Sequence, residues 1–133
     1  MITTQFTLYM ENRPGMLARV TKLLADAKVN IEGISASGST DIGLVQIVTS
    51  NVEKTRKLLR KAAIPFVAQD VALMPLRNRP GELARVISKI ARSGMNINYV
   101  YATACEGQGC RCYAIISAPN LKKVEAVCKA CGV

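Results

Sequence analysis

The sequence predicts an α+β fold built from two βαββαβ units in tandem, the second of which lacks a full last strand. Three observations lead to this prediction. A motif occurs twice at a fixed spacing, strand-like and helix-like hydrophobic patterns follow each copy in the same order, and the sequence stops soon after the fourth helical pattern. We expect the first domain over residues 1–68 and the second over residues 69–133.

The repeated motif is nine residues long. It reads NRPGMLARV over residues 12–20 and NRPGELARV over residues 78–86, so the copies lie 66 residues apart and differ at one position. The same offset relates VNI at residues 29–31 to MNI at residues 95–97. A repeat of this extent indicates a duplicated structural unit.

The first half of copy one passes from strand to helix and back to strands. Apolar residues at every second position predict a strand over residues 5–10, and apolar residues at helical spacing predict a helix over residues 14–28. Strands over residues 30–36 and 43–49 flank a turn rich in Gly, Ser and Asp. The inward face of the helix is expected to comprise Leu17, Val20, Leu24 and Ala27.

A second helix and a short strand complete copy one. Asn51 stands where a side-chain cap belongs, immediately before a second helical pattern. Pro65 cannot donate to a sheet and should keep the fourth strand, over residues 64–68, short or at an edge. The inward face of this helix is expected to comprise Val52, Thr55, Leu58, Leu59 and Ala62.

Copy two repeats the order with a longer hairpin loop. Its expected elements are a strand over residues 71–76, a helix over 80–93 with Leu83, Val86, Ile87 and Ile90 inward, strands over 96–104 and 111–117, and a helix over 120–130. Gly94 serves as a helix stop, and the loop over residues 105–109 is about three residues longer than its counterpart. The missing fourth strand should leave surface to cover, which favours self-association into a homodimer or higher oligomer.

The repeated motif joins a strand to a helix. Pro14 presets the backbone dihedral of a first helical turn, and Gly15 lets the backbone approach another group closely. The first amides of the helix then lack partners, which makes the junction suitable for a small anion such as a carboxylate.

This order of elements is the ferredoxin-like arrangement, and the residues ENRPG at 11–15 followed by VNI at 29–31 resemble the ACT domain. The resemblance is close in style to the serine-sensing domain of phosphoglycerate dehydrogenase and to tandem stand-alone ACT proteins. It implies a non-catalytic regulatory module that binds an amino acid at a domain interface, through the loop after the first strand and the start of the second. The positions implied are Asn12, Arg13, Pro14, Gly15, Met16, Leu17, Asn30 and Ile31 in copy one, and Asn78, Arg79, Pro80, Gly81, Leu83, Asn96 and Ile97 in copy two.

The chemistry of these residues suits a zwitterion. Amides near Gly15 can receive a carboxylate, and the side-chain oxygens of Asn12 and Asn30 can accept from an ammonium. Each asparagine can equally serve as a loop, cap or turn residue. Glu82 places a negative charge at the junction of copy two, so we favour copy one if only one copy binds. The sequence does not specify the amino acid.

Composition leaves one alternative open. Eighteen Lys and Arg against nine Asp and Glu give a net charge of +9, which suits either a solvated basic surface or a nucleic-acid-binding module. The basic helix over residues 54–61 would carry nucleic-acid binding. No run of residues is apolar enough for a membrane span, and the start resembles no signal peptide, so we expect a soluble cytoplasmic protein.

Catalysis and metal binding have weaker support. All five cysteines lie in copy two, at positions 105, 110, 112, 128 and 131, and their spacing could suit zinc or an iron-sulfur cluster. The repeat instead aligns Cys128 with Leu59 and Cys131 with Ala62, on a buried helix face. There is no histidine base, and no nucleophile or phosphate-binding motif. We therefore expect no cofactor, and regulation of a partner enzyme in trans.

Overall fold

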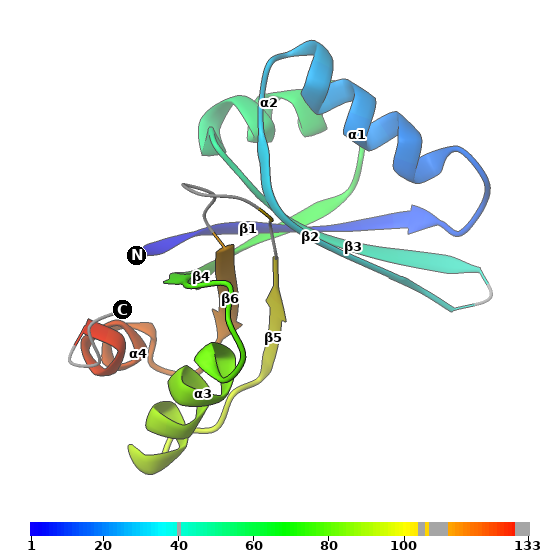
Figure 1. Ribbon diagram of the computed structural model, residues 1–133. Coiled ribbons are helices and arrows are strands. Elements are labelled where there is room, and N and C mark those ends of the chain that lie inside the picture. The colour runs from blue at the N-terminus through cyan, green and yellow to red at the C-terminus, as the bar shows by residue number, and fades with distance from the viewer. Residues whose placement is uncertain (40, 104–105, 107–111, 130–133) are drawn as a thin grey trace. The chain divides into compact units, whose positions relative to one another are not determined.

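The structure is a computed structural model of the chain, and it describes all residues except 40, 104–105, 107–111 and 130–133. The described elements alternate as the repeat predicts (Figure 1). In chain order they are β1 (Ile2–Glu11), α1 (Met16–Asp26), β2 (Ile31–Gly38), β3 (Ile42–Thr49), α2 (Val52–Lys61), β4 (Phe66–Leu76), α3 (Glu82–Arg92), β5 (Tyr99–Ala102), β6 (Cys112–Ser117) and α4 (Leu121–Lys129).

The first compact unit comprises residues 4–69. Its strands lie in the order β2-β3-β1-β4, with β3 antiparallel to both β1 and β2. Helices α1 and α2 cover one face of these strands (Figure 1). This is the βαββαβ arrangement of the α+β class. The fold predicted for copy one is therefore confirmed.

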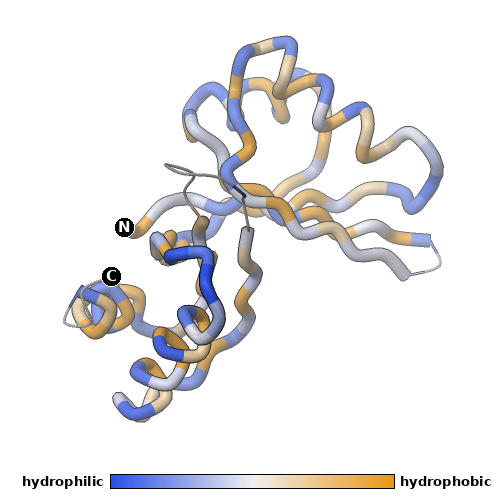
Figure 2. Tube along the Cα trace, viewed as in Figure 1, coloured by the Kyte–Doolittle hydropathy of each residue, from blue (hydrophilic) through white to orange (hydrophobic). Residues whose placement is uncertain are grey.

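The core of the first unit lies between its strands and its two helices. Phe6 and Leu8 of β1 are fully buried, together with Val20 and Leu24 of α1 and Leu59 of α2. Burying each such side chain favours folding by about 1.5–3 kcal/mol. Figure 2 shows the resulting alternation of hydrophobic and hydrophilic residues along the helices.

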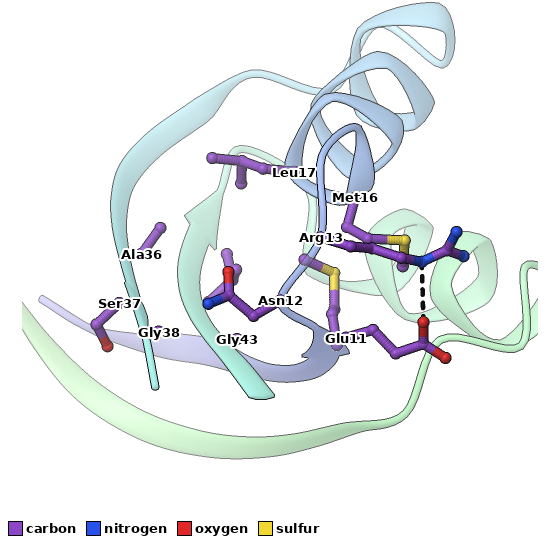
Figure 3. Close-up of a pocket in the computed structure, with 11 residues that line it drawn as sticks. Glu11, Asn12, Arg13, Met16, Leu17, Ala36, Ser37, Gly38 and Gly43 are labelled. Atoms are coloured by element: carbon purple, nitrogen blue, oxygen red, sulfur yellow. Dashed lines mark ion pairs between the residues drawn. The ribbon is translucent and has the colours of Figure 1, made fainter. Parts of the chain in front are cut away.

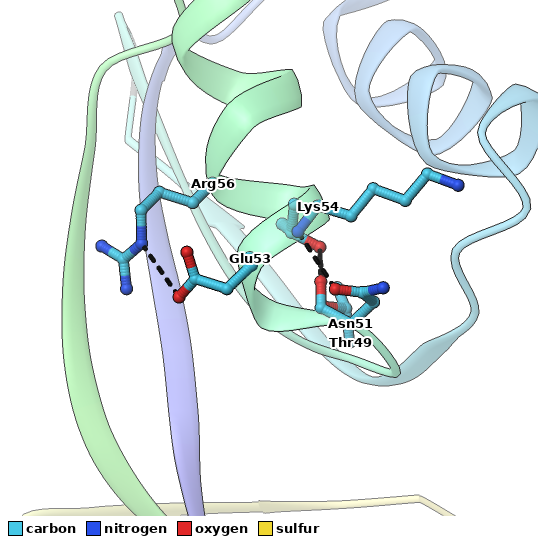
Figure 4. A network of polar contacts seen from close by, with 6 residues as sticks. Thr49, Asn51, Glu53, Lys54 and Arg56 are labelled. Carbon is cyan, nitrogen blue, oxygen red and sulfur yellow. Dashed lines mark hydrogen bonds and ion pairs between the residues drawn. The ribbon is translucent and has the colours of Figure 1, made fainter.

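The start of α2 is fixed by the predicted cap. The Asn51 side chain accepts a hydrogen bond of 3.0 Å from the backbone amide of Lys54 (Figure 4). The hydroxyls of Thr49 and Thr55 lie 2.7 Å apart, which ties the end of β3 to the first turn of the helix. The equivalent asparagine of copy two, Asn120, accepts from the Lys123 amide at 3.1 Å. The predicted capping role of Asn51 is therefore confirmed, and its repeat partner does the same.

The second compact unit comprises residues 1–3 together with residues 70–133. Its strands lie in the order β4-β6-β5, and its core includes Val86 and Ile90 of α3 and Val124 of α4. The domain boundary predicted between residues 68 and 69 stays a prediction.

The first residues of the chain take the place that the fourth strand of copy two would occupy. The Leu73 amide donates to the Met1 carbonyl at 2.7 Å, and the Met1 ammonium donates to the Leu73 carbonyl at 3.1 Å. In the first unit the equivalent neighbour of β1 is β4, and the Tyr9 amide donates to the carbonyl of Pro65, just before β4, at 3.1 Å. Among the described residues, α4 is the last element of copy two, and the edge of β4 that we expected to be uncovered is paired with the start of the chain.

Several predicted boundaries require correction. Helices α1 and α3 begin at Met16 and Glu82, not at Pro14 and Pro80. The glycine before each helix has a left-handed backbone, with φ of 89° and 90°, which a right-handed helix cannot contain. Residues 64–68 and 71–76 were predicted as two strands, but β4 is one strand over Phe66–Leu76, because no turn residue interrupts it.

The predicted inward faces are right except at the first turn of α1 and α3. Val20 and Leu24 are buried, but Leu17 is 41% exposed, and its repeat partner Leu83 is 37% exposed. Cys128 is buried, as predicted. Cysteines 105, 110 and 131 lie outside the described residues. Among the described residues, no helix has the length and apolarity to cross a membrane.

Candidate functional site

The junction between β1 and α1 is a tight turn. The Arg13 amide donates to the Glu11 carbonyl at 3.0 Å, and the Met16 amide donates to the Arg13 carbonyl at 3.4 Å. The Arg19 amide donates to the Gly15 carbonyl at 2.9 Å. Over the described residues, the amides of Leu17 and Ala18 have no acceptor within the fold. The amides available to a carboxylate are therefore those of Leu17 and Ala18, and the Met16 amide is already used.

The same turn recurs in copy two. The Arg79 amide donates to the Arg77 carbonyl at 2.9 Å, the Glu82 amide to the Arg79 carbonyl at 3.4 Å, and the Arg85 amide to the Gly81 carbonyl at 2.9 Å. The backbone of the motif is thus conserved between the copies within the molecule. The side chains that differ between the copies must therefore account for any difference in function.

A pocket of about 200 Å³ opens beside the first junction (Figure 3). Its walls come from the end of β1, the start of α1 and the hairpin between β2 and β3. Of the predicted site residues, it brings together Asn12, Arg13, Met16 and Leu17. The remaining lining residues are Met10, Glu11, Ala36, Ser37, Gly38, Gly43 and Val45.

Asn12 is held in this pocket by the hairpin. Its side-chain nitrogen donates to the Ser39 carbonyl, and its backbone amide donates to the Asp41 carbonyl at 3.0 Å. Gly38 makes room for it, because a Cβ on Gly38 would lie 2.9 Å from the Asn12 side-chain nitrogen. Within the described residues, the side-chain oxygen of Asn12 accepts no hydrogen bond. Asn12 can therefore present an acceptor of fixed position to a ligand.

Copy two has an equivalent pocket of about 150 Å³. It brings together the predicted residues Asn78, Arg79 and Leu83. Each lies 66 positions after a residue of the first pocket, so duplication of the sequence has duplicated the pocket as well. The remaining lining residues are Leu76, Arg77, Glu82, Ala102, Thr103 and Cys112.

Glu82 gives the second pocket a different charge. Its side chain is only 6% exposed, and its carboxylate lies 2.8 Å from Arg79 Nη2 and 3.2 Å from Arg85 Nη2. Hydrogen bonds from Arg79 first, and then from Arg85, hold the pKa of Glu82 below its ordinary value of 4.5. The carboxylate is therefore ionised at neutral pH and already paired with two guanidinium groups.

The remaining predicted site residues lie outside the two pockets. Pro14, Gly15, Pro80 and Gly81 belong to the turns and line neither of these two pockets. Asn96 is exposed and Ile97 packs against the core before β5 begins.

Asn30 and Ile31 lie at the other end of β2 from the Asn12 pocket. The Asn30 amide donates to Ser50 Oγ at 2.9 Å, and Ile31 pairs with Thr49 of β3. Gly38, the last residue of β2, contacts Asn12, and the strand between Ile31 and Gly38 spans roughly 20 Å. Within a single protein molecule, Asn30 and Asn12 are therefore too far apart to contact the same small ligand.

A family model with the description "ACT domain pair" matches residues 1–129. The chain belongs to the ACT domain pair family. The crystal structure of protein BT0572 from Bacteroides thetaiotaomicron is similar to this ACT pair, with 27% identity, a TM-score of 0.86, and coverage of 100% of this chain and 90% of that one. No curated protein matches the sequence.

Two further solved structures share the fold of this ACT pair. The ligand-free regulatory subunit of aspartate kinase from Thermus thermophilus has 18% identity and a TM-score of 0.66, with coverage of 99% of this chain and 95% of that one. Aspartokinase III from E. coli, in complex with lysine and aspartate, has 18% identity and a TM-score of 0.53, with coverage of 97% of this chain and 31% of that one. The likeness to these two proteins is one of fold.

Sequence reasoning missed the hairpin side of both pockets in this ACT pair. Residues 37–41 were interpreted only as a turn, although Ser37 and Gly38 line the first pocket. The repeat contained a signal, because Ser37 aligns with Thr103 at the same offset of 66, and both carry a hydroxyl group. Among the described residues, no group of His, Cys, Asp and Glu is arranged to hold a metal ion.

Proposed function

We propose that this ACT pair is a non-catalytic regulatory protein whose Asn12 pocket binds a free amino acid. One observation carries the proposal. The same turn and the same kind of pocket are built twice, from residues at a constant offset, beside helix amides that lack an internal acceptor. A repeated pocket of this size, with apolar walls and a few polar groups at the junction, suits a small ligand that carries a charged group at each end.

The pocket defines how the ligand would lie. Its carboxylate would accept from the amides of Leu17 and Ala18, where the helix dipole also favours a negative charge. Its ammonium would donate to the side-chain oxygen of Asn12. Met10 and Val45 would contact its apolar atoms, and the volume of about 200 Å³ favours a small amino acid.

Copy one is the better candidate because of charge. In copy two, the ionised carboxylate of Glu82 lines the pocket at the helix start. Glu82 already pairs with Arg79 and Arg85 there, so these two arginines are less available to a second carboxylate. We therefore propose one amino acid per chain, in the first pocket.

Asn30 enters the proposal through association of chains. It lies roughly 20 Å from Asn12 within one protein molecule. A small ligand that contacts an Asn12 and an Asn30 would therefore lie between two molecules. We accordingly propose a homodimer or a higher homo-oligomer. Light scattering that shows a single chain of about 14 kDa, with and without the amino acid, would exclude this part of the proposal.

Binding is tested by a thermal-shift screen against the twenty amino acids, followed by calorimetry with the amino acid that stabilises the protein most. Asn12→Ala removes the acceptor for the ammonium and should weaken affinity about ten- to a hundredfold, equivalent to about 1.5–3 kcal/mol. Asn78→Ala is the matched control in copy two and should leave affinity unchanged. Unaltered affinity in Asn12→Ala would place the amino acid elsewhere.

The regulated partner would be an enzyme acted on in trans. Aspartate kinase supplies an example among proteins of the same fold, because one of its ACT-containing chains is a regulatory subunit. The amino acid found in the screen would define which biosynthetic enzymes to test. Addition of this protein with the amino acid should change the activity of the partner enzyme, and addition of the protein alone should not.

Nucleic-acid binding remains the alternative function. The exposed side of α2 carries Lys54, Lys57, Arg60 and Lys61, which could contact phosphates. This function predicts affinity for DNA or RNA that falls steeply with salt and weakens in the double variant Lys57→Glu, Arg60→Glu. A gel shift showing only weak, non-specific binding at physiological salt would exclude it.

A further inference from the structure

The one position at which the two motifs differ changes the chemistry of the junction. In copy two, Glu82 lies between two arginines, with Oε1 2.9 Å from Arg79 Nε and Oε2 3.2 Å from Arg85 Nη2. This side chain is nearly buried. Copy two thus contains a carboxylate held by a pair of guanidinium groups.

Copy one retains the arginines without the carboxylate. Arg13 and Arg19 stand 66 positions before Arg79 and Arg85 on the same backbone turn, but Met16 replaces Glu82. These three residues line a pocket of about 290 Å³. Its far wall comes from residues 63–65, just before β4.

The present partners of these arginines leave donors available. Arg13 Nε lies 2.9 Å from a carboxylate oxygen of Glu11, and both side chains are more than 60% exposed, so the pair contributes little. Figure 3 shows this ion pair at the edge of the junction. Arg19 Nη2 donates to the Ala62 carbonyl at 3.1 Å. Each guanidinium has five N–H donors, so both can bind a further acceptor.

We propose that the pocket between Arg13 and Arg19 binds the carboxylate of a small organic acid, in the place that the Glu82 carboxylate takes in copy two. Bidentate pairing of arginine with carboxylate is strong and geometrically specific, and two arginines would hold both oxygens. Met10, Glu11, Arg13 and Met16 line both this pocket and the amino-acid pocket, whereas Arg19 and residues 63–65 line only this one of the two. The two pockets therefore adjoin, and Arg19 distinguishes the carboxylate site from the amino-acid site.

Succinate is the probe, and its neutral diamide, succinamide, is the control at equal ionic strength. The Nε–H resonances of Arg13 and Arg19 should shift and saturate with succinate and should stay in place with succinamide. Arg19→Gln should weaken succinate about ten- to a hundredfold, since it removes one charge-assisted pair. Arg60→Gln removes the same charge from an exposed site on α2 and should change affinity by less than about twofold.

Met16→Glu gives the sharpest test, because it supplies the carboxylate that copy two carries. This variant should lose succinate binding, while Met16→Gln, which has the same shape without the charge, should keep it within a few fold. If succinate shifts neither arginine, or binds Met16→Glu as well as Met16→Gln, the pocket is not a carboxylate site. If Arg60→Gln weakens binding as much as Arg19→Gln, the attraction is non-specific and the proposal is wrong. Loss of amino-acid binding in Asn12→Ala with succinate retained would separate the two sites.

Discussion

At the scale of residues, single side chains give the two junctions different properties on one backbone. The Asn12 side-chain nitrogen donates to the Ser39 carbonyl of the hairpin, and within the described residues its side-chain oxygen accepts no hydrogen bond. Met16 leaves an open pocket between two arginines, and Glu82 at the equivalent position pairs with both. The residue at this one position of the motif thus decides whether the two arginines of a junction share an internal carboxylate partner.

The pairing of Glu82 should make the stability of the protein depend on pH. The pKa of Glu82 is lowered in the folded state, so its ionised form stabilises the fold above its ordinary pKa of 4.5, and this contribution is lost as pH falls through the lower, folded pKa. Glu82→Gln should therefore lower the urea midpoint at neutral pH and have a smaller effect at about pH 3. Glu53→Gln, at an exposed residue 3.9 Å from Arg56, is the control and should have little effect at either pH. An equal loss for Glu82→Gln at both pH values would show that the charge is not used.

At the scale of elements, glycine sets where the helices begin. Gly15 and Gly81 have φ near +90°, so a right-handed helix can begin only at the residue after each glycine. No atom lies within 4 Å of the place where a Cβ on either glycine would stand. The requirement for glycine is therefore conformational and not steric.

Substitution of these glycines should cost similar amounts of stability in the two copies. Gly15→Ala and Gly81→Ala should each lower the free energy of unfolding by about 1–2 kcal/mol, since an L-residue is disfavoured in the left-handed region. Gly43→Ala is the control, because its φ is not in that region and its Cβ would make an ordinary contact of 3.6 Å with the Met10 carbonyl. Urea denaturation measures all three variants. A loss in Gly43→Ala as large as in the other two would point to packing instead of backbone strain.

At the scale of the molecule, the chain completes its second unit with its own beginning. Residues 1–3 belong to the second unit, and Met1 exchanges two hydrogen bonds with Leu73 of β4. The Met1 ammonium also lies 3.5 Å from Glu125 of α4. The second unit therefore includes a contact between residues 72 positions apart in the chain.

Removal of residues 1–3 should loosen the second unit selectively. The Leu73 amide would lose its acceptor and should exchange with solvent faster, and each lost hydrogen bond should cost about 0.5–1.5 kcal/mol. The Tyr9 amide, which donates to Pro65 in the first unit, is the internal control and should keep its protection. Equal protection of Leu73 with and without residues 1–3 would show that this pairing does not persist in solution.

The sequence by itself determined the duplication, the order of the elements and most of the buried helix faces. Those features follow from local periodicity and from residues with one dominant role, such as Asn51 as a cap. It also indicated that Asn12, Arg13, Met16 and Leu17 lie close together, because neighbours on one turn stay neighbours in the fold.

Only the tertiary structure decided which residues contact the turn between β1 and α1. The β2–β3 pairing brings Ser37 and Gly38 to Asn12 and carries Asn30 to the far end of the strand, and only the sheet register fixes that arrangement. The pairing of Met1 with Leu73 likewise joins residues that no local pattern connects. Long-range pairing depends on the summed burial of whole elements, so a pattern within one segment predicts that segment but not its partner.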